Sequence, residues 1–139
     1  MADVLTSAPS DGELLTPAVA RIADLWGLSN ARLGTILGLS PATASRLRAG
    51  ASTLDPASKS FEAGQFLLRL FRSLDASMGS DDDAARRWLA TPNLDLGTKP
   101  IDCTDTVRGL IALCDYVDGL RAHVETGRVA RHPQVIEPR

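Results

Sequence analysis

Two cysteines and two histidines are the residues of this sequence whose chemistry could make a metal site. Cys103, Cys114, His123 and His132 follow one another at separations of eleven, nine and nine positions. None of them forms the CxxC or HxxxH pair that zinc sites usually contain. The chain also has no G-x-S-x-G nucleophile turn and no glycine-rich phosphate loop. These patterns predict no metal and no cofactor, and they predict that the protein is not an enzyme.

Arginine is the other side chain whose distribution points to chemistry, because it pairs with phosphates and with guanine. Between Pro17 and Gly50 the chain has four arginines, at positions 21, 32, 46 and 48, and one acid, Asp24. This segment has a net charge of +3, whereas the whole chain has a net charge of −2. A basic segment on an otherwise acidic protein is typical of contact with nucleic acid.

Two groups of acids could also suggest a site. Asp81, Asp82 and Asp83 are consecutive, and we interpret them as the first turn of a helix, where carboxylates interact favourably with the helix dipole. Asp115 and Asp118 share one helix face and could form a carboxylate pair, but we interpret them as solvated surface.

The composition is that of a small globular protein. Of 139 residues, 44% are hydrophobic and 23% are charged, which is too apolar for a disordered chain. No uncharged run reaches the roughly 18 residues that a membrane span requires, and no basic segment precedes an apolar stretch at the start, so we expect no secretory signal. Two cysteines are too few for a disulfide framework. We therefore expect a cytoplasmic protein with reduced thiols.

Helix caps and stop signals follow one another from residue 17 to residue 127, with no alternating strand pattern between them. Residues 1–16 contain three acids and no basic residue, and we expect them to form a flexible arm that ends where Thr16 caps a helix at Pro17. Further helices are expected to begin near Ser29, Ser40, Pro56, Ser80 and Thr104. These signals predict an all-α fold.

Residues 30–49 fit the helix-turn-helix pattern. Gly34 is small where the two helices would cross, Gly38 tolerates the positive φ of the turn, and Ser40 caps the second helix. An ordinary corner of a helical bundle is the alternative. The outward positions of the second helix are the candidate DNA-binding residues, which are Ser40, Thr43, Ser45, Arg46 and Arg48. A single copy should bind weakly, so we expect a homodimer on a two-fold operator.

A run of rigid features then occupies residues 86–102: the helix end Trp88-Leu89, the turn Pro92-Asn93, the stop Leu96-Gly97 and the lead Lys99-Pro100-Ile101-Asp102. In this order, after a helix-turn-helix and a Phe- and Leu-rich segment at 61–71, they resemble the toxin-binding domain of the Xre/MbcA/ParS family of antitoxins, the partners of RES-domain toxins. The resemblance covers about residues 17–126 and is most specific over 86–109. Cys103 departs from it, because an aliphatic residue is expected there.

The resemblance implies the antitoxin of a type II toxin–antitoxin pair, which neutralises an NAD-degrading RES-domain toxin by covering its active site. It also implies that the N-terminal part represses the protein's own operon by binding operator DNA. The implied contact surface consists of Trp88, Leu89, Pro92, Asn93, Leu96, Pro100 and Ile101. An arginine near the C-terminus could in addition enter a pocket that accepts a pyrophosphate, the candidates being Arg121, Arg128, Arg131 and Arg139. Trp88 could instead belong to the core.

The predicted organisation is an N-terminal arm (1–16), a helix-turn-helix region (17–54), a long connecting helix (55–79), a toxin-binding domain (80–127) and an extended tail (128–139). Two other functions fit the same elements. One is a plain helix-turn-helix regulator whose C-terminal part dimerises or senses a ligand. The other is an interaction adaptor that has the helix-turn-helix shape without binding DNA.

Overall fold

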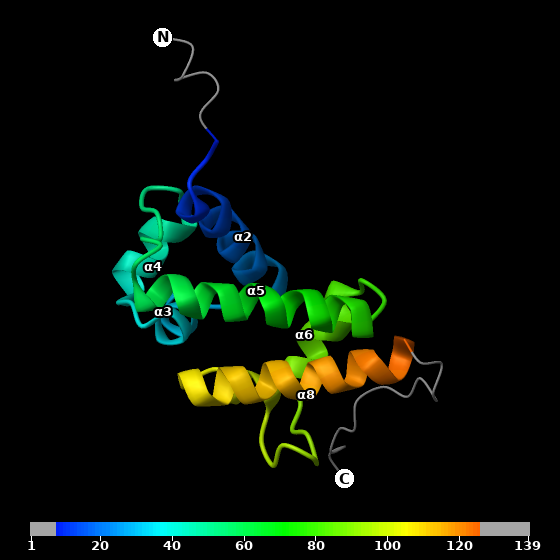
Figure 1. Cartoon of the computed structure of the whole chain (residues 1–139). Helices are drawn as coiled ribbons and strands as arrows, with labels where there is room; N and C mark the ends of the chain where they lie inside the picture. The colour runs from blue at the N-terminus through cyan, green and yellow to red at the C-terminus, as the bar shows by residue number, and fades with distance from the viewer. Residues whose placement is uncertain (1–7, 126–139) are drawn as a thin grey trace.

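The computed structural model describes residues 8–125, and helices make up most of this range (Figure 1). They are α2 (Asp11–Trp26), α3 (Asn30–Leu37), α4 (Pro41–Arg48), α5 (Lys59–Ser77), α6 (Asp82–Ala90), α7 (Pro100–Cys103) and α8 (Val107–Glu125). Within these residues there is no β-strand, only an isolated antiparallel bridge between Asn93 and Thr98. The predicted all-α fold is confirmed. Among the described helices, none is long and apolar enough to cross a bilayer.

The first helix, α2, begins at Asp11 rather than at Pro17. Ser10 is its N-cap, because the Ser10 hydroxyl accepts a hydrogen bond from the Glu13 amide (3.1 Å) and the Glu13 carboxylate accepts one from the Ser10 amide (3.3 Å). This reciprocal capping box satisfies two backbone donors at once. Thr16, the predicted cap, is buried inside the helix and donates to the carbonyl of Gly12. The predicted flexible arm is therefore wrong from residue 11 onward.

Helices α3 and α4 form the predicted helix-turn-helix, and both begin at the predicted serines. The Ser29 hydroxyl accepts a hydrogen bond from the Arg32 amide (3.0 Å), and the Ser40 hydroxyl accepts one from the Thr43 amide (3.1 Å). Both caps satisfy an amide that has no partner within its helix. The start of each helix is thus fixed by the local sequence.

The turn between α3 and α4 requires its two glycines. Gly38 ends α3 with φ at 71°, a left-handed conformation that glycine adopts without strain. Gly34 lies where the chain passes closest to α3, since a Cβ atom at this position would lie 2.5 Å from the carbonyl oxygen of Leu39. The steep crossing that defines this motif therefore depends on the missing side chain of Gly34.

Helix α5 joins the two halves of the molecule. It packs against α2 and α3 on one side and along α8 on the other (Figure 1). The rings of Trp26 and Phe71 lie 5.7 Å apart where α2 meets α5. The most deeply buried side chains between α5 and α8 are Leu67, Leu70, Leu74, Leu110, Leu113 and Val117. Because one helix contributes to both interfaces, the N-terminal and C-terminal halves share a continuous core.

Two helices begin one to three residues later than the sequence predicts. The hydroxyl of Ser58 accepts the Phe61 amide (3.1 Å), so α5 begins after Ser58 and not at Pro56. Asp81 caps α6 by accepting the Ala84 amide (3.0 Å). Ser80 cannot act as this cap because its φ of 62° belongs to the preceding turn.

The last long helix, α8, begins after Thr106 rather than at Thr104. Residues 100–103 form the separate short helix α7, so the predicted loop before the last helix is wrong at these positions. Thr104 is buried at the end of α7, and its hydroxyl donates to the Ile101 carbonyl (2.6 Å). The Thr106 hydroxyl instead accepts the Gly109 amide (3.0 Å) and stabilises the first turn of α8.

Arg32, near the start of α3, binds the segment around α7. Its guanidinium contacts the carboxylates of Asp102 (3.2 Å) and Asp105 (2.5 Å) and lies 3.5 Å from the Ile101 carbonyl oxygen. These three acceptors lie about 70 positions further along the chain. The helix-turn-helix is thereby tied directly to the C-terminal half.

A second polar cluster joins α5 to α8. Arg69 binds Asp115 (3.0 Å) and Asp118 (2.5 Å), and the Ser73 hydroxyl donates to Asp118. Partial burial by itself would raise the pKa of Asp118, but the hydrogen bonds from Ser73 and Arg69 outweigh it and lower the pKa. The interpretation as solvated surface is correct for Asp115, whose side chain is 67% exposed, and incomplete for Asp118, which is partly buried. Both carboxylates also bind Arg69 of the facing helix.

We predict opposite stability effects for two helical glycines. Gly34→Ala should lower the free energy of unfolding by about 2 kcal/mol, because the new methyl group overlaps the Leu39 carbonyl. Gly119→Ala in α8 should raise it by up to about 1 kcal/mol, since a Cβ there meets open space and alanine favours helix. Urea denaturation followed by circular dichroism measures both, and equal effects of the two substitutions would contradict this account of the turn.

Candidate functional site

The exposed face of α4 holds a small polar cluster around Arg46. The Thr43 hydroxyl accepts a hydrogen bond from Nη2 of Arg46 (3.0 Å) and lies 2.9 Å from the Ser40 hydroxyl. Ser45 is also exposed on this helix. The Arg46 side chain is thus held along the N-terminal turns of α4 by one hydrogen bond, and its other N–H groups remain available to a ligand.

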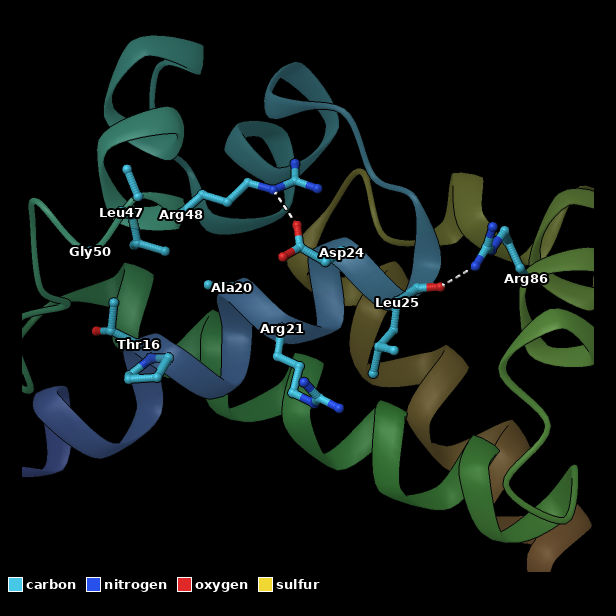
Figure 2. Close-up of a pocket in the computed structure, with 11 residues that line it drawn as sticks. Thr16, Ala20, Arg21, Asp24, Leu25, Leu47, Arg48, Gly50 and Arg86 are labelled. Atoms are coloured by element: carbon cyan, nitrogen blue, oxygen red, sulfur yellow. Dashed lines mark hydrogen bonds and ion pairs between the residues drawn. The ribbon is translucent and has the colours of Figure 1, made fainter.

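Arg48, the other arginine of α4, is used inside the protein. Its Nε donates to Asp24 (2.9 Å), and its Nη1 donates to the Leu28 carbonyl (2.6 Å) and to the Asn30 side chain (3.2 Å). Figure 2 shows the guanidinium reaching from α4 across to α2. Arg48 therefore holds the helix-turn-helix together, so its predicted contact with DNA would require breaking these bonds.

A groove of about 600 Å³ lies between α2 and α4, beside the Arg48–Asp24 pair (Figure 2). Arg86 also lines it, but Arg86 donates to the Leu25 carbonyl (2.9 Å). Arg21 is exposed at this groove and has no hydrogen-bond or ion-pair partner among residues 8–125. Because Arg32 and Arg48 are both engaged within the protein, Arg21 and Arg46 are the cations of this segment that remain available to a phosphate.

Four of the predicted toxin-contacting residues are buried. Trp88 and Leu89 are 5% and 3% exposed, and Asn93 and Pro100 are also inaccessible. Their side chains fill the C-terminal core beneath residues 91–99, so they cannot present a surface to a partner without rearrangement. This corrects the predicted contact surface. The accessible members of the set are Pro92, Leu96 and Ile101, the last two only in part.

Asn93 determines the shape of the loop between α6 and α7. Its backbone amide donates to the Thr98 carbonyl (3.0 Å), and its carbonyl accepts the Gly97 amide (2.9 Å). Its side-chain oxygen accepts the amides of Asp95 (2.9 Å) and Leu96 (3.2 Å). A buried asparagine that organises four backbone groups makes this loop a rigid turn, and Gly97 provides the left-handed φ of 72° that closes it.

Leu94 lies at the tip of this turn and is 65% exposed, although it is a large apolar side chain. Pro92 is exposed beside it, and Leu96 is half-buried. Figure 1 shows the loop projecting from the body of the protein beyond α8. Leu94 is not among the residues predicted from the sequence, although a leucine in a tight turn, where polar residues are usual, was an available signal. An apolar side chain on a rigid projecting turn is suited to insertion into a pocket of another protein.

The loop is anchored to α8 through Tyr116. The Tyr116 hydroxyl donates to the Asp95 carboxylate (2.7 Å), and its ring stacks on Trp88 with centroids 6.4 Å apart. Burial raises the pKa of Tyr116 to about 12, and the hydrogen bond to Asp95 acts in the same direction. The loop therefore has a polar contact to α8 in addition to its internal bonds.

Two family models match consecutive parts of the chain. The first, described as the antitoxin Xre-like helix-turn-helix domain, matches residues 8–72. The second, described as the antitoxin Xre/MbcA/ParS C-terminal toxin-binding domain, matches residues 73–122. The chain belongs to the Xre/MbcA/ParS antitoxins. A search of curated proteins found no match to it.

The two matches meet inside α5, so the long helix belongs to both domains of the antitoxin. The resemblance inferred from the sequence is confirmed. The N-terminal domain is of a helix-turn-helix type, which implies DNA binding, and the C-terminal domain is of a toxin-binding type, which implies a toxin partner.

Of the four arginines proposed to enter a toxin pocket, only Arg121 lies among residues 8–125. Arg121 is exposed on α8, lines a groove with Arg69 and Arg72, and interacts with other residues of the protein. Arg128, Arg131 and Arg139 lie outside the described residues. Their role in the antitoxin stays a prediction.

The single tyrosine of the antitoxin offers a direct test of the anchored loop. We predict that tyrosinate absorbance titrates with a pKa of about 12, and that Asp95→Asn moves this pKa toward the ordinary value of 10. Because the folded-state pKa is the higher one, the stability contributed by this group is complete below pH 10 and is lost as the pH rises to about 12. Circular dichroism checks that the protein is folded at each pH. An unshifted pKa in both proteins would contradict the anchored loop.

Proposed function

We propose that this antitoxin neutralises an NAD-degrading RES-domain toxin by covering the toxin's active site, and that it represses its own operon by binding operator DNA as a homodimer. The observation that carries the toxin half is the rigid loop at 91–99 with Leu94 exposed at its tip. The match to a toxin-binding domain over residues 73–122 supports the same assignment.

The loop is suited to tight binding because it is ordered before the partner arrives. Asn93, Gly97 and Tyr116 already restrict it, so docking loses little conformational entropy. Pro92, Leu94 and the exposed part of Leu96 offer apolar surface at its end. We propose that Leu94 fills an apolar recess at the mouth of the toxin's cleft and that Ile101 extends this contact along α7.

The DNA half rests on α4. Arg46 is exposed and oriented by Thr43, and an arginine in the major groove can pair with guanine through two hydrogen bonds. Arg21 is the additional cation that we propose to contact a phosphate. Figure 1 shows α4 on one side of α5 and the loop at 91–99 on the far side of α8. Toxin and operator can therefore bind the same molecule without overlapping.

For the toxin-binding half, we predict that Leu94→Ser weakens neutralisation, whereas Leu94→Met retains it. Removing a leucine that becomes buried on binding costs about 2 kcal/mol, or roughly a thirtyfold rise in Kd. The assay mixes purified antitoxin with the RES-domain toxin encoded beside it and follows NAD⁺ consumption as the antitoxin concentration rises.

The serine and methionine variants have the same backbone and differ in apolar surface at one exposed position, so loss of folding does not explain a difference between them. Equal neutralisation by wild type and Leu94→Ser would remove the loop tip from the interface. A toxin that stays fully active in excess wild-type antitoxin would overturn the proposed function itself, and the plain-regulator alternative would then stand.

For the DNA-binding half, we predict that Arg46→Ala abolishes sequence-specific binding to the promoter of the antitoxin's own operon, because each guanine contact contributes about 1–3 kcal/mol. Arg48→Ala is the matched control from the same helix. It should keep sequence-specific binding but lower the free energy of unfolding by about 1–2 kcal/mol, since three intramolecular hydrogen bonds are lost. Gel-shift titration and thermal melts measure the two effects. An Arg46→Ala protein that shifts the promoter like wild type would exclude α4 from base reading.

A further inference from the structure

A third groove lies between α2 and α5, away from α4 and from the loop at 91–99. It shares Arg72 with the groove at Arg121. From α2 it is lined by Asp11, Leu14 and Leu15, and from α5 by Phe61, Leu68 and Arg72. Its volume is about 380 Å³. We call it the α2–α5 groove. It contains no residue of α4 and none of the loop at 91–99.

The centre of the α2–α5 groove is apolar. Leu15 and Phe61 are buried and form its floor, and Leu68 is half-buried at its wall. Leu14 is 60% exposed, which makes it one of the most exposed large apolar residues of the described chain. Leaving this much leucine surface in water is unfavourable by roughly 25 cal/mol for each Å² of apolar area, so a partner that covers it gains free energy.

The ends of the α2–α5 groove carry opposite charges. The two helices run in the same direction, since Leu15 lies against Gly64 and Trp26 lies against Phe71. Asp11 therefore lies toward one end and Arg72 toward the other. Both are exposed, and neither has an ion-pair partner among residues 8–125.

We propose that the α2–α5 groove is the homodimer seam, and that a second copy of this chain lies across it in the opposite direction. A two-fold interface requires a surface that complements itself. Reversing the groove places Asp11 of one protomer opposite the partner's Arg72, and the partner's Asp11 opposite Arg72. The exposed Leu14 of each protomer, one helical turn from Asp11, is then covered by the partner. This inference deepens the proposed function, because reading a two-fold operator requires a dimer.

The position of the seam is compatible with both other activities. The residues of α2 that line this groove differ from those that line the groove beside α4, so a partner seated here leaves Arg46 exposed. Leu94 and the loop at 91–99 likewise contribute nothing to the groove. A dimer formed here can hold two α4 helices toward DNA and still offer two toxin-binding loops.

The apolar part of the seam is tested by Leu14→Glu in the full chain. We expect wild type to sediment as a dimer and Leu14→Glu to raise the dimer Kd by about tenfold or more, because each protomer would then bury a carboxylate against apolar surface. Val107→Glu is the matched control, since Val107 is also a large apolar residue, 54% exposed, and lies outside the groove. It should sediment as wild type does.

The charged ends are tested by exchanging the two charges. Asp11→Arg alone and Arg72→Asp alone should each weaken the dimer several-fold, because each places like charges opposite one another. The double exchange should restore it, an outcome that a merely structural role of either residue does not produce. Circular dichroism melts confirm that each variant is folded.

Three results would overturn the seam: a monomeric wild type, an unchanged dimer in Leu14→Glu, or a double exchange no better than the single ones. Deletion of residues 1–7 tests whether the α2–α5 groove is occupied by a second copy or by the chain's own N-terminus. The shortened chain should dimerise like wild type, and its loss of dimerisation would also overturn the proposal. Failure of toxin neutralisation leaves sedimentation unaffected. A wild-type dimer that these substitutions do not weaken overturns the seam but not the proposed homodimer, whereas a monomeric wild type overturns both.

Discussion

The ion pairs of Arg32 fix how the two halves of this antitoxin lie relative to each other. One guanidinium from the helix-turn-helix contacts Asp102 and Asp105 on either side of α7. Partly exposed pairs of this kind contribute about 0–1 kcal/mol each, so their value lies in orientation more than in stability. The same arginine that raises the charge of the N-terminal segment in the sequence is thus neutralised by the C-terminal domain. The helix-turn-helix and the C-terminal domain are consequently held together by polar contacts as well as by their shared core.

Helix α5 joins the same two halves through apolar packing. Its leucines pack against α8 while its other faces meet α2 and α3, and Arg69 and Ser73 add charged contacts to Asp118. The antitoxin therefore has no flexible linker between its domains. The boundary between the two family matches falls within this helix, so neither domain has a complete core without it.

Features that depend on local chemistry could be predicted from the sequence, and features that depend on distant contacts could not. The helix-turn-helix and its turn were predicted correctly because the residues that form them act on neighbours within a few positions. These residues are Ser29, Ser40, Gly34 and Gly38. The capping box at Ser10 is equally local and was missed, because Thr16-Pro17 is a similar signal further along the chain.

The functional residues depend on tertiary contacts, and here the sequence was a weaker guide. Spacing places Arg46 and Arg48 two positions apart on one short helix, yet only packing against α2 directs Arg48 to Asp24 and Leu28. Likewise Trp88 and Asn93 belong to the motif that identifies the toxin-binding domain, but a motif can be recognisable because it builds the core. The exposure of Leu94, a large apolar residue of that segment, is determined by the fold of the turn around it.

The turn at Asn93 separates the residues that shape the loop from the residue it displays. Backbone amides, a buried amide side chain and Gly97 define the conformation, and none of these interactions involves the side chain at position 94. Exchanging that side chain therefore changes the exposed surface of the loop without changing the hydrogen bonds that define its conformation. Duplicated antitoxin genes in one genome can diverge at such a position by single codon changes, each copy acquiring its own cognate partner while the scaffold is inherited intact.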